Sequence, residues 1–188
     1  MIGVLALQGA FIEHINILKK LNVEAKEVRT VEDFNVVDAL IIPGGESTVM
    51  IKLLKQTGLD DAIKEAAQHD MPIYGTCAGA IVLANETDKE ITPLQLIDIT
   101  VKRNAYGSQQ DSFEAEVTFN GNLHTIFIRA PMIESIGKEV VSLAEHNGKT
   151  ILARQNNILV STFHPELTND TRVHQYFLEM LRPIITVR

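Results

Sequence analysis

The chain has 188 residues, of which 45% are hydrophobic and 22% charged, which predicts one globular domain over residues 1–188. Its formal net charge of −7 argues against nucleic acid or an anionic membrane surface as the main partner. One cysteine, no segment typical of a signal peptide and no apolar run near the roughly 20 residues that span a bilayer favour a cytoplasmic protein without an internal disulfide.

The first half of the chain alternates short apolar stretches with segments whose apolar residues recur at helical spacing. Strands are expected at residues 2–7, 23–28, 39–42 and 71–74. Helices are expected at about 11–21, at 50–57 with Ser47 or Thr48 as the N-cap, at about 60–69, and over 80–84. Because short connections join these strands and helices, the predicted fold class is α/β, a three-layer arrangement with a mostly parallel sheet and helices on both faces.

The second half has a different pattern, with shorter β-prone stretches. They lie at residues 97–102, 113–119, 125–129, 139–143, 150–153 and 158–163. Two dipeptides between them, Asn120-Gly121 and Asn147-Gly148, are typical of hairpin turns, so we expect antiparallel additions to the sheet. A last helix should have an apolar inner face made of Val173, Phe177, Met180 and Leu181.

The only cysteine lies in the segment Gly75-Thr76-Cys77-Ala78-Gly79, where a strand should turn sharply into a helix. Small residues on both sides of Cys77 allow a tight turn and leave space for a ligand above the thiol. The first turn of a helix also favours the thiolate, because the peptide dipoles present their positive end there. Cys77 is therefore a candidate nucleophile, and the alternative is a buried structural cysteine.

A second strand end carries paired glycines, in Pro43-Gly44-Gly45-Glu46-Ser47-Thr48. Glycines let backbone N–H groups face a ligand without a side chain in between, which is the geometry of an anion or oxyanion site. A plain strand–turn–helix connection is the alternative for this segment.

A third strand end carries His164-Pro165-Glu166. In an extended chain, residues two apart point the same way, and Pro165 favours extended geometry at His164. Glu166 can then hold one imidazole nitrogen while the other faces outward, which orients the ring and raises its basicity. A turn histidine beside a solvated glutamate is the alternative.

Together these three segments contain the parts of an acyl-transfer site: a thiol, a histidine backed by a carboxylate, and a loop of N–H donors. The carboxyl ends of parallel strands meet at one edge of a sheet, so we expect the three segments to gather there.

These motifs resemble those of the class I, or triad, glutamine amidotransferases, which have a flavodoxin-like fold. Within that superfamily the chain is similar to the glutaminase subunits of two-subunit pyridoxal 5′-phosphate synthases. The similarity runs nearly from end to end, through the segments 3–9, 40–48, 103–107, 111–114, 127–131 and 163–168. The sequence Ser108-Gln109-Gln110 departs from the family pattern, because a basic residue, Gln and an aliphatic residue usually follow Gly107.

The resemblance implies hydrolysis of L-glutamine to L-glutamate and ammonia through a cysteinyl thioester, with Cys77, His164 and Glu166 as catalytic residues. It implies oxyanion donors at the backbone N–H groups of Gly45 and Ala78. Glutamine contacts are implied for Gly45, Glu46, Ser47, Arg103, Ile128 and Arg129. It also implies a hetero-oligomer with many copies of each subunit, in which a synthase subunit receives the ammonia, with no cofactor and no metal in the glutaminase itself. Gln8, just past the first strand, is a further hypothesis, as a residue that couples activity to that partner.

Three other interpretations remain open at this point. A glutaminase of another pathway, such as imidazole glycerol phosphate synthase, would carry the same triad, and so could a cysteine peptidase-like hydrolase. A regulatory binding subunit with an inactive site is the third. The remaining histidines show no metal-ligand spacing and are interpreted as background, namely His14, His69, His124, His146 and His174.

Overall fold

The computed structural model describes residues 1–88, 91–103 and 112–181. Its elements in chain order are β1 (Ile2–Leu5), α1 (Phe11–Lys20), β2 (Ala25–Val28), α2 (Val31–Phe34), β3 (Ala39–Ile42), α3 (Ser47–Thr57), α4 (Leu59–Gln68), β4 (Ile73–Thr76), α5 (Ala78–Leu83), β5 (Ala84–Thr87), β6 (Ile97–Lys102), β7 (Ser112–Thr118), β8 (Asn122–Ile128), β9 (Met132–Ile136), β10 (Val141–His146), β11 (Lys149–Gln155), β12 (Ile158–Ser161), a 3₁₀ helix (Pro165–Leu167) and α6 (Arg172–Glu179). None of the helices in these ranges is both long and apolar enough to cross a membrane.

The centre of the fold is a seven-stranded sheet with the order β10-β11-β12-β4-β3-β1-β2. The five strands from β12 to β2 are parallel to one another, while β11 and β10 continue the sheet antiparallel. The predicted mostly parallel sheet with antiparallel additions is therefore confirmed.

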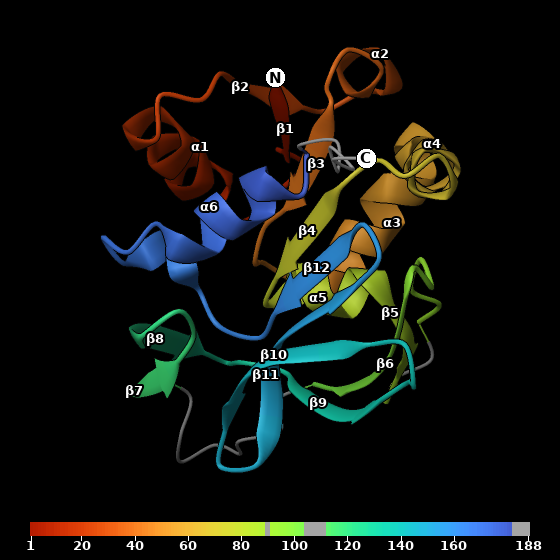
Figure 1. The fold of residues 1–188 in the computed structure, drawn as a ribbon. Coiled ribbons are helices and arrows are strands. Elements are labelled where there is room, and N and C mark those ends of the chain that lie inside the picture. The colour runs from red at the N-terminus through yellow and green to blue at the C-terminus, as the bar shows by residue number, and fades with distance from the viewer. Residues whose placement is uncertain (89–90, 104–111, 182–188) are drawn as a thin grey trace, which may run out of the picture.

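Helices cover both faces of this sheet (Figure 1). Alternate residues of each buried strand enter two separate cores: Leu40 and Ile42 pack with α3, α4 and α5, whereas Ile41 packs with α1 and α6. Strands buried on both faces read as continuous apolar runs, and this is why residues 39–42 were recognisable as a strand. The three predicted layers are confirmed.

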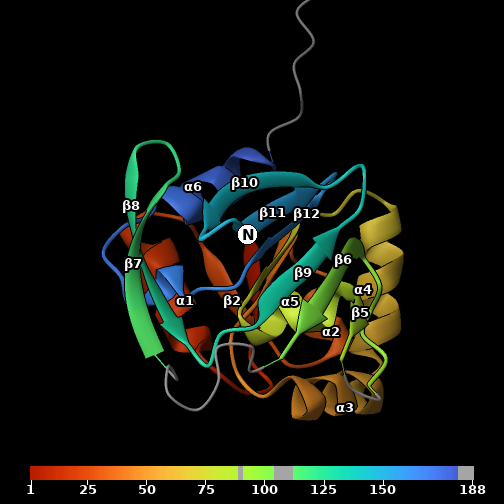
Figure 2. The same cartoon turned by 90° about the horizontal axis from the view of Figure 1, so that it is seen from below.

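The other strands of the second half form two small sheets outside the main one, which differs from the expectation that all of them extend it. Strands β5, β6 and β9 form one and the hairpin β7–β8 forms the other, on opposite sides of the main sheet (Figure 2). The sequence pattern did not predict β5 and β9. Strand β5 is short and half-exposed and has no alternating apolar pattern. Its sequence therefore does not indicate a strand, and only the structure shows its pairing with β6.

Both expected hairpin turns are present. Asn120-Gly121 connects β7 to β8 and Asn147-Gly148 connects β10 to β11, and all four residues have positive φ angles. Such turns match the twist of the flanking strands, which explains why Asn-Gly occurs at these positions.

Candidate active site

Three neighbouring parallel strands, β3, β4 and β12, end at the same edge of the main sheet and deliver the three predicted segments to it. Ser161, the last residue of β12, pairs with Thr76, the last residue of β4, and the backbone N–H of Cys77 donates to the Ser161 carbonyl at 2.8 Å. On the other side of β4, strand β3 runs into Gly44 and Gly45. The expected gathering at the carboxyl ends of the strands is confirmed.

Cys77 lies at a strained turn between β4 and α5. Its φ and ψ angles of 50° and −106° are unfavourable for a residue with a side chain, and such strain is found where a turn must present a nucleophile. The turn also requires Gly79, because a Cβ there would lie 2.1 Å from the Ile42 carbonyl oxygen. Helix α5 has only six residues, so the dipole at its N-terminus is small.

His164 and Glu166 form the predicted pair, with 2.6 Å between His164 Nδ1 and Glu166 Oε1. The local geometry differs from the expectation, because Pro165–Leu167 form a 3₁₀ helix instead of an extended segment. Proline suits the first position of a helical turn, and one such turn also brings the two side chains together. Burial favours a neutral His164, but hydrogen bonds with Cys77 and Glu166 outweigh burial and raise the pKa of His164 to about 10.

Glu166 is itself buried beside this ring. Burial would raise the pKa of its carboxyl group, but the nearby His14 and the hydrogen bond from His164 lower the pKa below its usual value. The pair is thus an imidazolium and a carboxylate.

Gly44 must lack a side chain for this arrangement to exist. A Cβ on Gly44 would lie 2.6 Å from His164 Cε1 and 3.4 Å from Cys77 Cβ. The Gly44 carbonyl accepts a hydrogen bond from the Ala10 N–H at 3.1 Å, which fixes the orientation of the peptide that joins Gly44 to Gly45.

The side chain of Gln8 makes two hydrogen bonds to the loop of residues 43–48, which contains Gly44 and Gly45. Its side-chain nitrogen donates to the Glu46 carbonyl at 2.8 Å, and its side-chain oxygen accepts from the Glu46 N–H at 3.2 Å. A Cβ on Gly45 would collide with the Gln8 amide at 2.7 Å. Gln8 therefore contacts the loop that carries the predicted oxyanion donor Gly45.

The N-cap of α3 is Glu46, so the prediction of Ser47 or Thr48 at that position was wrong. The Glu46 carboxylate accepts hydrogen bonds from the N–H groups of Thr48 and Val49, at 3.0 and 2.7 Å. A carboxylate can reach these free N–H groups as well as a hydroxyl can, and its charge is favourable at a helix N-terminus.

Arg103 crosses from the end of β6 to this helix start. Its guanidinium donates to Glu46 Oε1 at 3.1 Å and to Thr48 Oγ1 at 2.9 Å, and its side chain is only 12% exposed. These bonds fix the guanidinium at the wall of the site. Residues 104–111, which include the rest of the Arg103 motif and Ser108-Gln109-Gln110, lie outside the described residues.

The residues Gly44, Gly45, Cys77, His164 and Arg103 line one cleft of about 650 Å³, a volume within the usual range of small-molecule sites. Every predicted site residue except Glu166 contributes to its wall, namely Gly45, Glu46, Ser47, Cys77, Ala78, Arg103, Ile128, Arg129 and His164. Glu166 lies behind His164, where it contacts the ring and not the cleft.

The hairpin β7–β8 brings Ile128 and Arg129 to the cleft. The Ile126 carbonyl accepts a hydrogen bond from the His164 N–H at 2.8 Å, and the Ile128 carbonyl lies 3.8 Å from Cys77 Sγ. Arg129 has a positive φ angle of 44°, an uncommon backbone conformation beside a candidate site.

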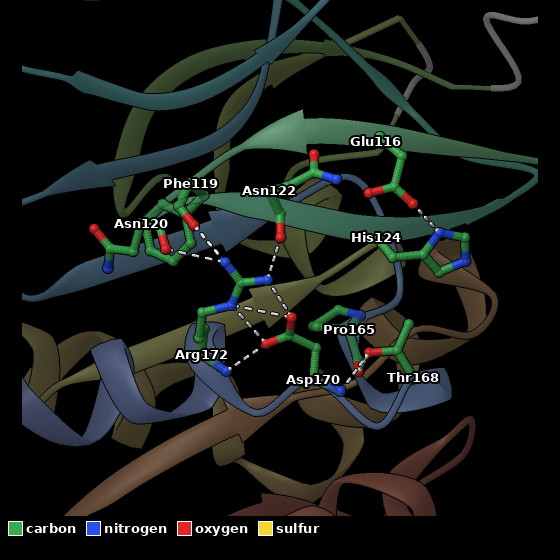
Figure 3. A network of polar contacts seen from close by, with 9 residues as sticks. All are labelled: Glu116, Phe119, Asn120, Asn122, His124, Pro165, Thr168, Asp170 and Arg172. Atoms are coloured by element: carbon green, nitrogen blue, oxygen red, sulfur yellow. Dashed lines mark hydrogen bonds and ion pairs between the residues drawn. The ribbon is translucent and has the colours of Figure 1, made fainter.

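Arg172, the first residue of α6, fixes the far end of this hairpin (Figure 3). Its guanidinium donates to the backbone carbonyls of Phe119, Asn120 and Asn122 and to the carboxylate of Asp170. The segment that carries His164 and the hairpin that carries Ile128 are therefore joined at two places.

Sequence reasoning missed two histidines that lie behind the triad. His14 in α1 and His174 in α6 are fully buried, and His14 Nε2 lies 3.6 Å from Glu166 Oε2. One signal was available, because His14 falls three residues after Phe11 and four before Leu18, on the apolar side of its helix.

Comparison with known proteins gives the same family by three routes. The sequence pattern of the SNO glutamine amidotransferase family matches residues 4–183. A relative from Methanocorpusculum labreanum named pyridoxal 5′-phosphate synthase subunit PdxT is 52% identical over 96% of this chain and 97% of its own length. A relative from Dehalococcoides mccartyi with the same name is 49% identical with the same coverage.

Solved structures agree with this result. A crystal structure described as a glutamine amidotransferase is 45% identical and superimposes with a TM-score of 0.93, over 96% of this chain and 98% of that one. A putative GMP synthase subunit from Thermoplasma acidophilum, 16% identical with a TM-score of 0.71 over 96% and 92% of the two chains, shares the fold.

Proposed function

The chain belongs to the SNO glutamine amidotransferase family, and we propose that it is the glutaminase subunit of a pyridoxal 5′-phosphate synthase. It hydrolyses L-glutamine to L-glutamate and ammonia, and the ammonia passes to a synthase subunit that builds the coenzyme. The observation that carries this proposal is the convergence of Cys77 and of His164, which Glu166 holds at 2.6 Å, beside Gly44 on the wall of one cleft of substrate size.

The triad residues divide the chemistry between them. The Cys77 thiolate attacks the side-chain amide carbon of glutamine, and the electron pair of the C=O bond moves to oxygen. As the C–N bond breaks, His164 gives its proton to the nitrogen, so ammonia leaves and a γ-glutamyl thioester remains. His164 then takes a proton from water, the hydroxide attacks the thioester, and the Cys77 thiolate leaves as glutamate forms.

Two backbone N–H groups, those of Gly45 and Ala78, are the proposed oxyanion donors. The location of both residues in the wall of the cleft supports this role. Loss of one such donor typically costs about 10²–10³-fold in kcat.

Glutamine itself is proposed to contact Gly45, Glu46, Ser47, Arg103, Ile128 and Arg129. Ser47 gives specific support, since its hydroxyl is buried at the cleft and has no hydrogen-bond partner within the described ranges. The guanidinium groups of Arg103 and Arg129 suit the substrate α-carboxylate, because a planar fork of N–H donors matches two carboxylate oxygens.

We further propose one glutaminase domain over residues 1–188, in a hetero-oligomer with a synthase subunit that contains many copies of each. The name of the relatives, a subunit of pyridoxal 5′-phosphate synthase, supports that partner. The net charge of −7 favours a protein partner over nucleic acid or a membrane surface, and the single cysteine suits the cytoplasm.

The names of these relatives favour this assignment over a glutaminase for imidazole glycerol phosphate synthase or a peptidase-like hydrolase. The test is glutamate release from glutamine, with and without the candidate synthase, for the wild type and for Cys77→Ala. We expect weak activity alone, stimulation by the synthase, and no activity in Cys77→Ala. Equal turnover by both variants would exclude the proposed chemistry.

The pathway is tested separately by following the label from glutamine with ¹⁵N in its side-chain amide. We expect the label in pyridoxal 5′-phosphate when the synthase, ribose 5-phosphate and glyceraldehyde 3-phosphate are present. Free ammonia formed without any labelled coenzyme would contradict the proposed partner and leave the glutaminase chemistry intact.

A further inference from the structure

The Glu166 carboxylate has two oxygens, and the triad uses only one. Oε1 is 2.6 Å from His164 Nδ1, which donates to it. Oε2 is fully buried and has no partner at hydrogen-bond distance among the described residues. A buried carboxylate oxygen without a donor is costly, so a polar group close to it has a functional consequence.

The group that faces Oε2 is the ring of His14, which comes from α1 on the sheet face that carries the second core. His14 Nε2 is 3.6 Å from Oε2 and 3.2 Å from Thr76 Oγ1. On the other side of the ring, His14 Nδ1 is 2.9 Å from His174 Nε2, in α6. Four buried side chains therefore lie in a continuous row of polar groups, namely His164, Glu166, His14 and His174.

Both additional histidines are neutral. Burial is the main cause that lowers the pKa of His14, although Glu166 opposes it, and burial lowers the pKa of His174 well below its usual value. A neutral ring has one N–H and one bare nitrogen, so the single contact between the two rings requires one to donate and the other to accept.

One assignment of the two protons agrees better with the surroundings, because it turns an N–H and not a bare nitrogen toward the Glu166 carboxylate. If His14 carried its proton on Nδ1, its bare Nε2 would face the Glu166 carboxylate, and His174 would have to place its own proton on Nδ1. That nitrogen of His174 is buried with no partner among the described residues, so an N–H there would be unsatisfied. With the proton on Nε2 of both rings, His174 donates to His14, and His14 directs its N–H toward Oε2 and Thr76.

We propose that His14 is a positioning residue of the glutaminase, a neutral imidazole whose Nε2–H stabilises the second oxygen of Glu166 while His174 holds it in that tautomer. The inference depends on the triad roles proposed above. Its consequence concerns the steps in which His164 has given up its proton. The ion pair with Glu166 is then lost, and the N–H of His14 keeps the buried carboxylate ionised and in place to receive the imidazolium again.

The other ionisable groups that face Glu166 and His14 do not change in the test variants. Glu166 faces His164, His14 and the buried phenol of Tyr74, and His14 is influenced by His164 and by Glu13 of its own helix. Glu13 and Tyr74 are unchanged in the variants below, so a difference among those variants reports the His14 contact.

The kinetic test compares His14→Leu, which removes the donor, with His14→Gln, whose amide offers an N–H at a similar reach. With the synthase subunit present, we expect His14→Leu to lower kcat about tenfold, because it removes the polar group nearest to a buried carboxylate oxygen, with KM within twofold. The acidic limb of its kcat profile should move to higher pH, because Glu166 without a donor protonates more readily. His14→Gln should recover most of kcat and the wild-type limb.

Phe177→Leu is the matched control, since Phe177 is equally buried and packs in the same core without contacting Glu166. It should lower the melting temperature and leave the pH profile unchanged. A His14→Leu enzyme with wild-type kcat and pH profile would overturn the proposal, and so would a His14→Gln enzyme no better than His14→Leu.

A second measurement needs no activity. The ¹⁵N spectrum of the wild-type imidazoles, with the His14 signals assigned by their loss in His14→Gln, should show His14 protonated on Nε2 and bare on Nδ1. A proton on Nδ1 would overturn the proposal even if no leucine variant folds. An inactive wild type would instead refute the proposed function, so the two failures are distinguishable.

Discussion

Glu166→Gln is the substitution that most directly tests how the site activates Cys77. Glutamine has nearly the same shape as glutamate but no charge, so the contact at 2.6 Å to His164 Nδ1 remains possible as a neutral hydrogen bond. The pKa of His164 rises from 6.5 to about 10 because the effects of its two partners exceed the opposing effect of burial, and this net rise corresponds to about 5 kcal/mol. If Glu166 accounts for about half of this net rise, its charge stabilises the His164 imidazolium by roughly 2–3 kcal/mol, or about 10²-fold.

We therefore expect Glu166→Gln to lower kcat for glutamine about 10²-fold or more, with a smaller change in KM. The sign of the pH effect follows from the raised pKa. Without the carboxylate, His164 loses its proton at lower pH, so the alkaline limb of kcat/KM should shift to lower pH. Glutamate release with saturating synthase subunit measures both, and circular dichroism checks the fold. A variant that keeps more than half of the wild-type kcat with an unshifted alkaline limb would refute the reasoning.

Three further predictions concern the supporting structure. Gly44→Ala should lower kcat about 10²-fold, because its Cβ would meet His164 Cε1 at 2.6 Å and displace the ring. The control is Gly148→Ala, at an open turn with φ of 71°. It should lower the free energy of unfolding in urea by roughly 1 kcal/mol and leave kcat unchanged. Arg172→Ala removes donors to three carbonyls of the β7–β8 hairpin, so the free energy of unfolding should fall by about 2 kcal/mol, with faster amide exchange there; unaltered exchange would contradict the anchoring role. Because burial lowers the pKa of His174, the neutral ring contributes to stability above pH 6.5, and this contribution is lost as the pH falls below 6.5. The melting temperature of His174→Leu should therefore fall less between about pH 7 and 5 than that of the wild type. Parallel curves of melting temperature against pH would exclude His174 as a source of the acid sensitivity.

Local patterns predicted the elements best where one segment alone carries the information. The run Ala39–Ile42 was recognisable because a strand buried on both faces is apolar throughout, and the Asn-Gly turns because they supply positive φ angles. The strands β5 and β9 could not be predicted in the same way, since each is short, has only one fully buried residue and pairs with β6, which is distant in the sequence from β9.

The cap of α3 shows the same limit within the site. Ser47 and Thr48 are ordinary capping residues, but Glu46 takes that position because Arg103, 57 residues away in the sequence, holds its carboxylate at the helix start. No pattern within residues 43–48 contains that information.

What the sequence by itself determined is the set of reacting groups: Cys77 at a glycine-flanked turn, and His164 two residues before Glu166. Their chemistry is encoded in residue type and spacing, which are properties of short segments. Only the tertiary structure decided what surrounds them, above all the fully buried His14 and His174. A histidine on an apolar helix face has the same local pattern whether it meets hydrocarbon or a carboxylate, and the packing of α1 and α6 against the sheet determines which it meets.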